Sequence, residues 1–251
     1  MLSADQFKGH AVIILAMLLG GSSLLLFAGF LIAGPFSLIC WNISEPQALL
    51  SDALLSTVFF LQHSGMVRRS FRGWLSSAMP AHYYPAVYSI ASGMVLTAVV
   101  LLWQPSHTIL FDAQGFWRVP FRAAFLLAAS GFVWAVRALG TFDLFGRIAI
   151  LSHLAGLRDQ QQAPHLLVRG PYLWIRHPLY FFTLVFIWAT PSLSSDRLLF
   201  NLLWTFWIVL GAYLEEKDLV AKFGETYRQY QETVPMLLPW RGPVGRSLET
   251  S

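Results

Sequence analysis

Long apolar stretches separated by short polar segments run along most of the chain. Each stretch approaches the roughly 20 residues that an α-helix needs to cross a lipid bilayer. A helix satisfies its own backbone hydrogen bonds inside lipid, whereas an isolated strand does not. The pattern therefore predicts an all-α polytopic integral membrane protein with about five to six transmembrane helices. The apolar stretches lie at residues 11–33, 48–67, 85–104, 119–139, 179–194 and 197–214.

The last two apolar stretches predict a C-terminal helical hairpin. Pro191 ends a helix, and the serine and aspartate residues that follow it favour a turn. Two helical arms joined by so short a turn lie antiparallel, which brings Arg176–Tyr180 close to the acidic pair Glu215 and Glu216. The first arm is the shorter one. We therefore expect either a tilted hairpin or a first arm that crosses the bilayer only in part.

The composition agrees with a membrane environment. Hydrophobic residues make up 56% of the 251 residues and charged residues only 12%, whereas soluble domains carry about 25% charged residues. The net charge of +4 does not indicate nucleic-acid binding, because the basic residues lie in loops between apolar stretches. A lipid bilayer is the expected partner. The single cysteine, Cys40, cannot form an internal disulfide.

Lysine and arginine residues in the loops predict the orientation in the membrane. Three segments are basic: the loop after the second stretch, the long segment after the fourth and the C-terminal tail. The loops at the opposite ends carry fewer basic residues. With an even number of crossings every basic segment falls on one side, so both termini are expected in the cytoplasm. The basic residues are Arg68, Arg69, Arg72, Arg147, Arg158, Arg169, Arg176, Lys217, Lys222, Arg228, Arg241 and Arg246.

The chain is expected to have two parts. Residues 1–139 form a four-span membrane region, and residues 140–251 contain a cytoplasmic connector, the hairpin and a tail. The connector, 140–175, mixes polar residues with apolar patches and is too long for a simple linker. Side chains that could perform chemistry gather where the connector meets the hairpin.

Two interpretations of that meeting point stay open from the residues alone. Pro171 and Pro178 keep the backbone before them extended, which leaves N–H and C=O groups free to bind a ligand. Alternatively, arginine and histidine reach lipid headgroups here and tyrosine anchors the interface. Glu215 and Glu216 end an apolar arm and need partners or solvent, which favours a functional site. An ion pair with Arg176 would be a purely structural solution.

The hairpin and its tail carry a motif of fixed spacing. It comprises Arg176-His177-Pro178-Leu179-Tyr180, Glu215-Glu216-Lys217-Asp218-Leu219, Phe223-Gly224, Tyr227, Tyr230 and Val234-Pro235. In this motif the chain resembles the membrane methyltransferases related to isoprenylcysteine carboxyl methyltransferase. Further stretches resemble the bacterial methanethiol S-methyltransferase group of that superfamily, and the match covers about two-thirds of the chain. These stretches are Leu61-Gln62-His63-Ser64, Phe142-Asp143-Leu144-Phe145-Gly146, Trp188-Ala189-Thr190-Pro191 and Val234-Pro235-Met236-Leu237-Leu238-Pro239.

The resemblance implies a multi-pass methyltransferase of the bacterial inner membrane that uses S-adenosylmethionine. The adenine of this cofactor needs an apolar, aromatic surface, and its ribose hydroxyls and ammonium group need carboxylate and backbone acceptors. The chain has no Gly-x-Gly-x-x-Gly loop after a strand, so a hairpin pocket would replace that way of holding a cofactor. The implied cofactor-binding residues are His165, Leu166, Leu167, Val168, Tyr172, His177, Pro178, Leu179, Tyr180, Glu215 and Glu216.

Two departures from the superfamily bear on the methyl acceptor. Phe182 stands where the family often has glycine, so the cofactor channel is expected to have a different shape. Gly211 stands where the prenylcysteine enzymes carry an arginine associated with a substrate carboxylate. The missing arginine argues against a carboxylate acceptor and suits a small thiol. The expected reaction converts methanethiol to dimethyl sulfide.

The expected mechanism is direct, in-line transfer of the sulfonium methyl group to a thiolate, in which most of the work is alignment of the two reactants. Because a cysteine-like thiol has a pKa of about 8.5, a base or a cationic field assists its ionisation. The catalytic candidates are His63, Asp143 and Arg176. A histidine inside a span is a functional candidate, although His63 could equally be a hydrogen-bonded packing residue. The histidines show no metal-ligand spacing, so no metal is expected.

Other functions stay open at this stage. The same cofactor could serve a different acceptor, such as another thiol, a lipid or an isoprenoid-linked group. A non-enzymatic, denitrification-associated membrane protein would share the Gln-His-Ser type of second span, but the Glu-Glu signature of the hairpin favours an enzyme. A transporter is the least favoured alternative, because the chain shows neither an internal repeat nor a polar helix pair at the midplane.

Overall fold

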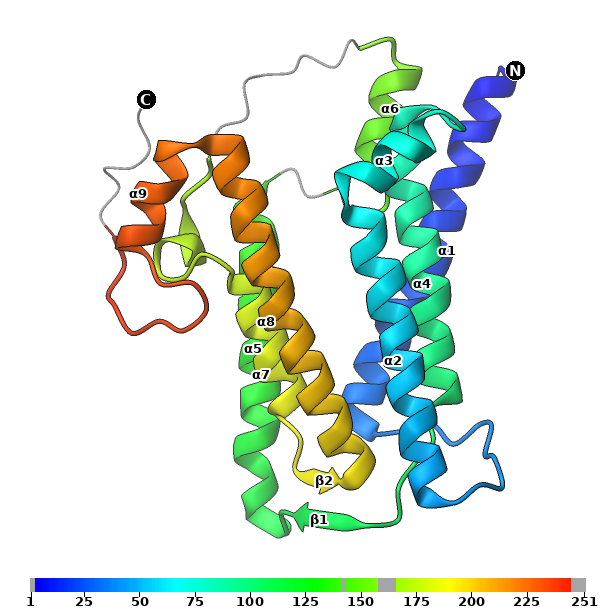
Figure 1. Ribbon diagram of the computed structural model, residues 1–251, viewed down its shortest axis with the longest axis vertical. Coiled ribbons are helices and arrows are strands. Elements are labelled where there is room, and N and C mark those ends of the chain that lie inside the picture. The colour runs from blue at the N-terminus through cyan, green and yellow to red at the C-terminus, as the bar shows by residue number, and fades with distance from the viewer. Residues whose placement is uncertain (1–2, 141–142, 158–165, 245–251) are drawn as a thin grey trace. The chain divides into compact units, whose positions relative to one another are not determined.

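The structure is a computed structural model that describes residues 3–140, 143–157 and 166–244, and it confirms an all-α architecture (Figure 1). The helices are α1 (Ala4–Ala33), α2 (Glu45–Val67), α3 (Arg69–Ser76), α4 (Tyr84–Leu102), α5 (Arg118–Leu139), α6 (Arg147–Leu154), α7 (Pro178–Trp188), α8 (Ser195–Phe223) and α9 (Glu225–Thr233). Three 3-10 turns, η1 (Ala81–Tyr83), η2 (Gly115–Trp117) and η3 (Gly170–Leu173), and two paired short strands, β1 (Ile109–Asp112) and β2 (Ser192–Ser194), complete the described elements.

Four helical segments of the described chain are long enough and apolar enough to cross a membrane: Ala4–Ala33, Ala81–Leu102, Gly115–Leu139 and Ser195–Phe223. Helix α2 is 23 residues long but carries Asp52, Gln62 and His63 along its length. Helix α7 has 11 residues, so it is about 16 Å long, roughly half of the hydrocarbon core. The first hairpin arm is therefore a partial helical crossing, which is one of the two alternatives that the sequence predicted.

The chain divides into two compact units. The first contains residues 1–108, 143–160 and 194–200, and the second contains residues 109–142, 161–193 and 201–251. Helix α5 packs against α7, and both lie in the second unit. The expected division at residue 139, between a four-span membrane region and the part with the connector, hairpin and tail, stays a prediction.

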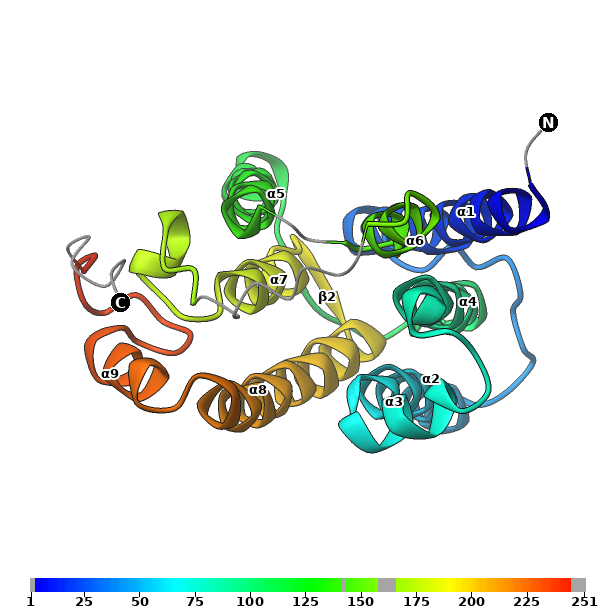
Figure 2. The same ribbon diagram turned by 90° about the horizontal axis from the view of Figure 1, so that it is seen from above.

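In the first unit, α4 lies between α1 and α2 (Figure 2). Small residues bring α1 and α4 close together. A Cβ atom added to Gly93 would lie 2.7 Å from the carbonyl oxygen of Leu19, and one added to Gly20 would lie 2.3 Å from the hydroxyl oxygen of Ser89. Close backbone approach of this kind is how helices gain packing energy in lipid, where no hydrophobic force drives them together.

The start of α8 is anchored in the first unit. The buried Arg197 donates to the carbonyl oxygens of Phe30 and Leu31 at the end of α1, at 3.4 and 3.2 Å. The buried Asp196 accepts a hydrogen bond of 3.1 Å from the indole N–H of Trp103. A cation at a helix C-terminus satisfies carbonyl groups that lack partners within the helix. The polar residues at the start of α8 are therefore buried, and they bind this end of the helix to α1 and Trp103.

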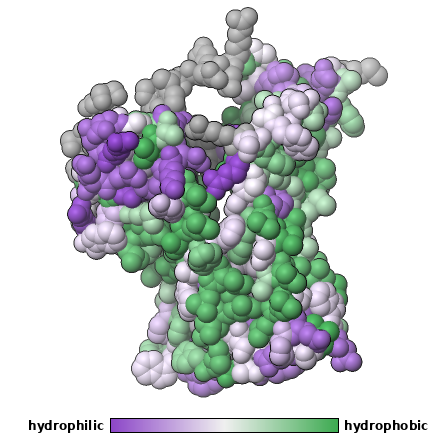
Figure 3. Space-filling model, viewed as in Figure 1, coloured by the Kyte–Doolittle hydropathy of each residue, from purple (hydrophilic) through white to green (hydrophobic). Residues whose placement is uncertain are grey.

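In the second unit, α7 lies between α5 and α8 (Figure 2). The ring of Phe182 covers Gly131 of α5 so closely that a Cβ atom there would lie 2.1 Å from the ring. Helix α8 continues past the predicted end of the second arm, through Glu215 and Glu216, and Gly224 follows it with a φ of +59°. Figure 3 shows hydrophilic residues over α9 and hydrophobic residues over the side of α8.

Candidate functional site

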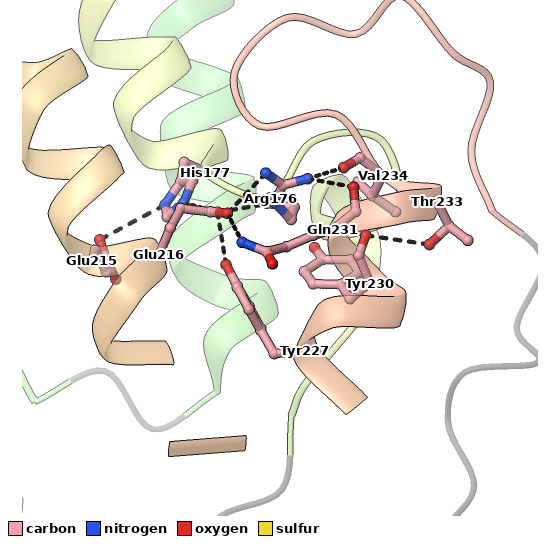
Figure 4. Close-up of polar contacts among 9 residues, drawn as sticks. All are labelled: Arg176, His177, Glu215, Glu216, Tyr227, Tyr230, Gln231, Thr233 and Val234. Atoms are coloured by element: carbon pink, nitrogen blue, oxygen red, sulfur yellow. Dashed lines mark hydrogen bonds and ion pairs between the residues drawn. The ribbon is translucent and has the colours of Figure 1, made fainter. Parts of the chain in front are cut away.

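A buried ion pair joins the start of the hairpin to its end. Nε and Nη2 of Arg176 donate to the two carboxylate oxygens of Glu216 at 2.9 and 2.8 Å (Figure 4). The two side chains are only 9% and 8% exposed. The planar guanidinium matches the carboxylate with two parallel hydrogen bonds, which is the strongest geometry for such a pair. The convergence of the Arg-His-Pro segment with the acidic pair is thereby confirmed.

Glu216 also accepts hydrogen bonds from three further side chains. His177 donates through Nε2 at 2.6 Å, Tyr227 donates its hydroxyl at 2.8 Å, and the amide of Gln231 donates to the other oxygen. With Arg176 these donors use the acceptor capacity of an ionised carboxylate, which is about four lone-pair sites. A buried carboxylate is stable when it is paired and hydrogen-bonded in this way. Glu216 therefore connects α8, α9 and the Arg-His-Pro segment, and no acceptor capacity is left for a ligand.

The C-terminal tail completes the surroundings of Arg176. Its Nη1 donates to the backbone carbonyl oxygens of Gln231, at 2.9 Å, and of Val234. Its backbone N–H donates to the carbonyl oxygen of Pro235 at 2.9 Å. The Val-Pro end of the motif thus has a structural reason, because it supplies acceptors for the arginine. All these groups hold Arg176 in one orientation.

Tyrosines of α9 form the apolar support beneath this network. Tyr227, Tyr230 and Val168 are buried in one cluster, and the hydroxyl of Tyr230 donates to the carbonyl oxygen of Tyr172 at 2.6 Å. Burial raises the pKa of Tyr227, and its hydrogen bond to Glu216 raises it further. The phenol therefore stays protonated and acts as a donor. Val168, which the resemblance implies as a cofactor contact, is 3% exposed and packs in this cluster.

Glu215 differs sharply from its neighbour in sequence. Its side chain is 45% exposed, and Oε2 lies 3.7 Å from Nδ1 of His177, which is too long for a direct hydrogen bond. The ring of His177 stacks on Tyr180 with 5.4 Å between centroids. A carboxylate with free acceptor sites, an imidazole and a phenol ring thus adjoin one another. This combination suits a ligand with hydroxyl or cationic groups and a flat apolar part.

The remaining implied cofactor residues surround this place or lie outside the description. Pro178 is buried in the first turn of α7, and Leu179 beside it is half-buried. Leu166 is half-buried, and Leu167 is 45% exposed. Burial and the nearby charge of Glu215 raise the pKa of Tyr172. His165 lies outside the described residues.

The catalytic candidates lie in different units. His63 and Asp143 belong to the first unit, and Arg176 belongs to the second. On α2, Nε2 of His63 lies 2.9 Å from the hydroxyl oxygen of Tyr88, and Nδ1 lies 3.3 Å from that of Ser92. Both hydroxyl groups come from α4. The histidine is therefore part of a small polar cluster between two apolar helices.

The stretch around Asp143 has a clear packing role. Oδ2 of Asp143 accepts a hydrogen bond of 3.0 Å from the backbone N–H of Ala149 in the first turn of α6, where a carboxylate stabilises the helix N-terminus. Gly146 has a φ of +71°, and a Cβ atom on it would lie 2.5 Å from the backbone nitrogen of Ala86. Only glycine fits there. The close contact of Gly146 with Ala86 packs the start of α6 against α4. A catalytic role for Asp143 stays a prediction.

Sequence reasoning missed three residues of these networks. Gln231 lies four positions after Tyr227 on α9, so both reach Glu216 from one helix face, and this spacing was a usable signal. Tyr88 and Ser92 also lie four positions apart, on α4, and both face His63. Within residues 3–140, 143–157 and 166–244, no group of three His, Cys, Asp or Glu residues could hold a metal ion.

Comparison with known proteins gives consistent relatives. A methanethiol S-methyltransferase of Pseudomonas deceptionensis is 40% identical over 205 residues, covering 78% of this chain and 74% of that protein. One from Pseudomonas sp. strain GM41(2012) is 38% identical over 207 residues, covering 80% and 76%. Methanethiol S-methyltransferase 1 of Bradyrhizobium diazoefficiens is 31% identical over 206 residues, covering 80% and 70%. No protein-family model and no solved structure matches the chain. The chain belongs to the same family as these enzymes.

Proposed function

We propose that this chain, as a member of the methanethiol S-methyltransferase family, transfers a methyl group from S-adenosylmethionine to methanethiol and releases dimethyl sulfide. The observation that carries the proposal is its identity of 38% and 40% to enzymes of that name over about three quarters of their length. The missing arginine at Gly211 agrees with it, because a small thiol has no carboxylate to be recognised.

The residues at the end of the hairpin fit S-adenosylmethionine by their chemistry. Glu215 offers a carboxylate with free acceptor sites for hydroxyl or ammonium groups, and the half-buried ring of Tyr180, which stacks on the buried His177, offers an aromatic surface for the adenine. When bound, this cofactor supplies a methyl group on a sulfonium centre, which a thiolate accepts while the sulfonium becomes a neutral thioether.

Arg176 and Glu216 act as positioning residues in this proposal. Glu216 accepts a hydrogen bond from Nε2 of His177 and so fixes the imidazole ring. Glu215, the preceding residue of α8, lies near the other ring nitrogen, Nδ1. An aligned pair of reactants gains most of its rate from such fixed geometry. We assign the guanidinium of Arg176 to the structure of the site, because all three of its nitrogens already donate to protein acceptors.

His63 is the residue that we propose as the base for the thiol proton. Its imidazole is held by the hydroxyl groups of Tyr88 and Ser92, and a neutral imidazole has one ring nitrogen that can accept a proton. Asp143 is the second candidate, although it already stabilises the start of α6. The thiol proton passes to the base, and the resulting thiolate forms the new carbon–sulfur bond.

We place the protein in the bacterial inner membrane with both termini in the cytoplasm, where the basic segments are retained. The acceptor is tested by headspace gas analysis of cells that express the chain and receive methanethiol. The expected result is dimethyl sulfide well above the level of cells with an empty vector. Production at the empty-vector level would remove methanethiol as the acceptor.

The cofactor is tested separately by calorimetric titration of the purified protein with S-adenosylhomocysteine. We expect wild-type protein to bind and Glu215→Gln to bind at least tenfold more weakly, about the value of one charged hydrogen bond. Glu225→Gln, an exposed carboxylate on α9, is the matched control and should bind like wild type. Undiminished binding by Glu215→Gln would contradict the role of this carboxylate.

A further inference from the structure

Helix α3 combines basic and aromatic side chains on a short helix between α2 and α4. Arg72 is exposed, and Trp74 is 66% exposed. Helices that lie in the membrane interface carry this combination of arginine and tryptophan. Residues 53–111 contain no aspartate or glutamate. The positive charge of α3 is therefore not neutralised by any residue of its own or the adjoining segments.

A groove of about 320 Å³ lies between α3 and the start of α4. The guanidinium carbon of Arg72 lies 4.6 Å from the ring centroid of Tyr84 on α4, which fixes the arginine over one wall. Leu75, Met79 and Pro80 supply apolar walls. Among the described residues no carboxylate forms an ion pair with Arg72. One end of the groove is thus cationic and the rest is apolar.

A second cation lies at the same end of the first unit. The ammonium group of Lys8 lies 5.7 Å from the ring centroid of Tyr83, directly before α4. Basic groups close to a membrane surface attract the anionic lipids of the cytoplasmic leaflet. The surroundings of the groove therefore favour an anion with an apolar tail.

We propose that this groove binds the phosphate headgroup of an anionic glycerophospholipid, a site separate from the methyl-transfer site. Arg72 donates to the phosphate oxygens, for which a guanidinium has the matching fork geometry. Leu75, Met79 and Pro80 contact the glycerol and the first methylene groups of the acyl chains. A lipid fits better than free phosphate, because most of the lining is apolar.

The test uses the purified full chain titrated with short-chain phosphatidylglycerol or phosphatidylcholine, with bound lipid counted by mass spectrometry of the intact complex. We expect wild-type protein to prefer phosphatidylglycerol and Arg72→Gln to bind it about fivefold more weakly, since one basic residue near the surface contributes about that factor. Arg122→Gln, at an exposed position of α5 outside the groove, should leave the affinity unchanged.

A second variant, Met79→Glu, places a carboxylate in the groove and should weaken phosphatidylglycerol binding without removing any cation. It keeps the proposal testable if Arg72→Gln fails to fold. Equal affinity of the wild-type protein for both lipids would overturn the proposal, and so would unchanged phosphatidylglycerol binding in Met79→Glu or in a folded Arg72→Gln. Displacement of the lipid by millimolar inorganic phosphate would assign the site to free phosphate and also overturn it.

Discussion

Two consecutive glutamates at the end of the hairpin have different environments and therefore different expected roles. Glu216 is buried and accepts hydrogen bonds from Arg176, His177, Tyr227 and Gln231. Glu215 is half-exposed and has no hydrogen bond to a side chain among the described contacts. Residues that neighbour each other on a helix point about 100° apart, so Glu216 faces the interior and Glu215 the surface.

Glu216→Gln should destabilise the protein strongly, whereas Glu215→Gln should not. The first change leaves the buried guanidinium of Arg176 without its counter-charge, which costs about 3–5 kcal/mol of unfolding free energy. The second changes a half-exposed group and should stay within about 0.5 kcal/mol of wild type. Thermal or denaturant unfolding in detergent measures both. Equal stability of the two variants would contradict the structural role of Glu216.

The role of His63 is tested by Tyr88→Phe. This change removes the tyrosine hydroxyl that lies 2.9 Å from Nε2 of His63 and keeps the aromatic ring. If His63 is the base, this variant should lower kcat about tenfold, a loss in the range of one hydrogen bond, with cofactor affinity unchanged. His63→Gln, which removes the proposed base itself, should lower kcat further, again with cofactor affinity unchanged. Undiminished kcat in His63→Gln would show that the histidine only packs.

At the scale of elements, the sequence predicted the hairpin but not its details. Helix α7 ends at Trp188, six residues before the predicted end, because the chain then turns into β2 and pairs with β1. Hydropathy cannot reveal that pairing, since β1 lies in a distant segment. Helix α8 continues past the predicted end to Phe223. The pair Glu215 and Glu216 marks where the apolar stretch ends, but the helix itself continues because good helix formers follow.

The packing of α1 against α4 gives a prediction at the same scale. Gly93→Ala adds a methyl group 2.7 Å from a backbone oxygen of α1, which cannot move without separating the helices. We expect a loss of about 1–3 kcal/mol in the unfolding free energy. Gly211→Ala in α8 is the matched control, because nothing lies within 4 Å of its added Cβ. It should be neutral or stabilise by about 0.5–1 kcal/mol. Equal unfolding midpoints in detergent would contradict the close contact.

At the scale of the whole molecule, the convergence of Arg176 with the acidic pair was predictable because antiparallel arms leave few alternatives. The different environments of Glu215 and Glu216 could not be predicted, because they depend on the rotation of α8 about its axis. The sequence also could not show that Val168 packs under α9 or that Asp143 stabilises the start of α6. Both are contacts between segments whose relative placement depends on tertiary packing.

The same ion pair limits how the hairpin can lie in a membrane. Because Glu216 at the end of the hairpin binds Arg176 at its start, the hairpin begins and ends on one side, whatever the depth of α7. Four long helices of the described chain, α1, α2, α4 and α5, precede it. If each crosses the membrane, the C-terminal tail lies on the same side as the N-terminus, and the loop that contains β1 lies on the other.

Reporter fusions test this topology. Fluorescent protein should fold and fluoresce when fused at either terminus, since it requires the cytoplasm. Alkaline phosphatase should be active when fused after Gln114, between β1 and α5, and inactive at either terminus. Because the basic residues that follow α2 resist translocation, Arg68→Gln combined with Arg72→Gln should weaken this asymmetry. Alkaline phosphatase activity at the C-terminus of the unaltered chain would mean an odd number of crossings. The hairpin itself cannot supply the odd crossing while Arg176 and Glu216 remain paired, so in that case α2 would be the helix that fails to cross.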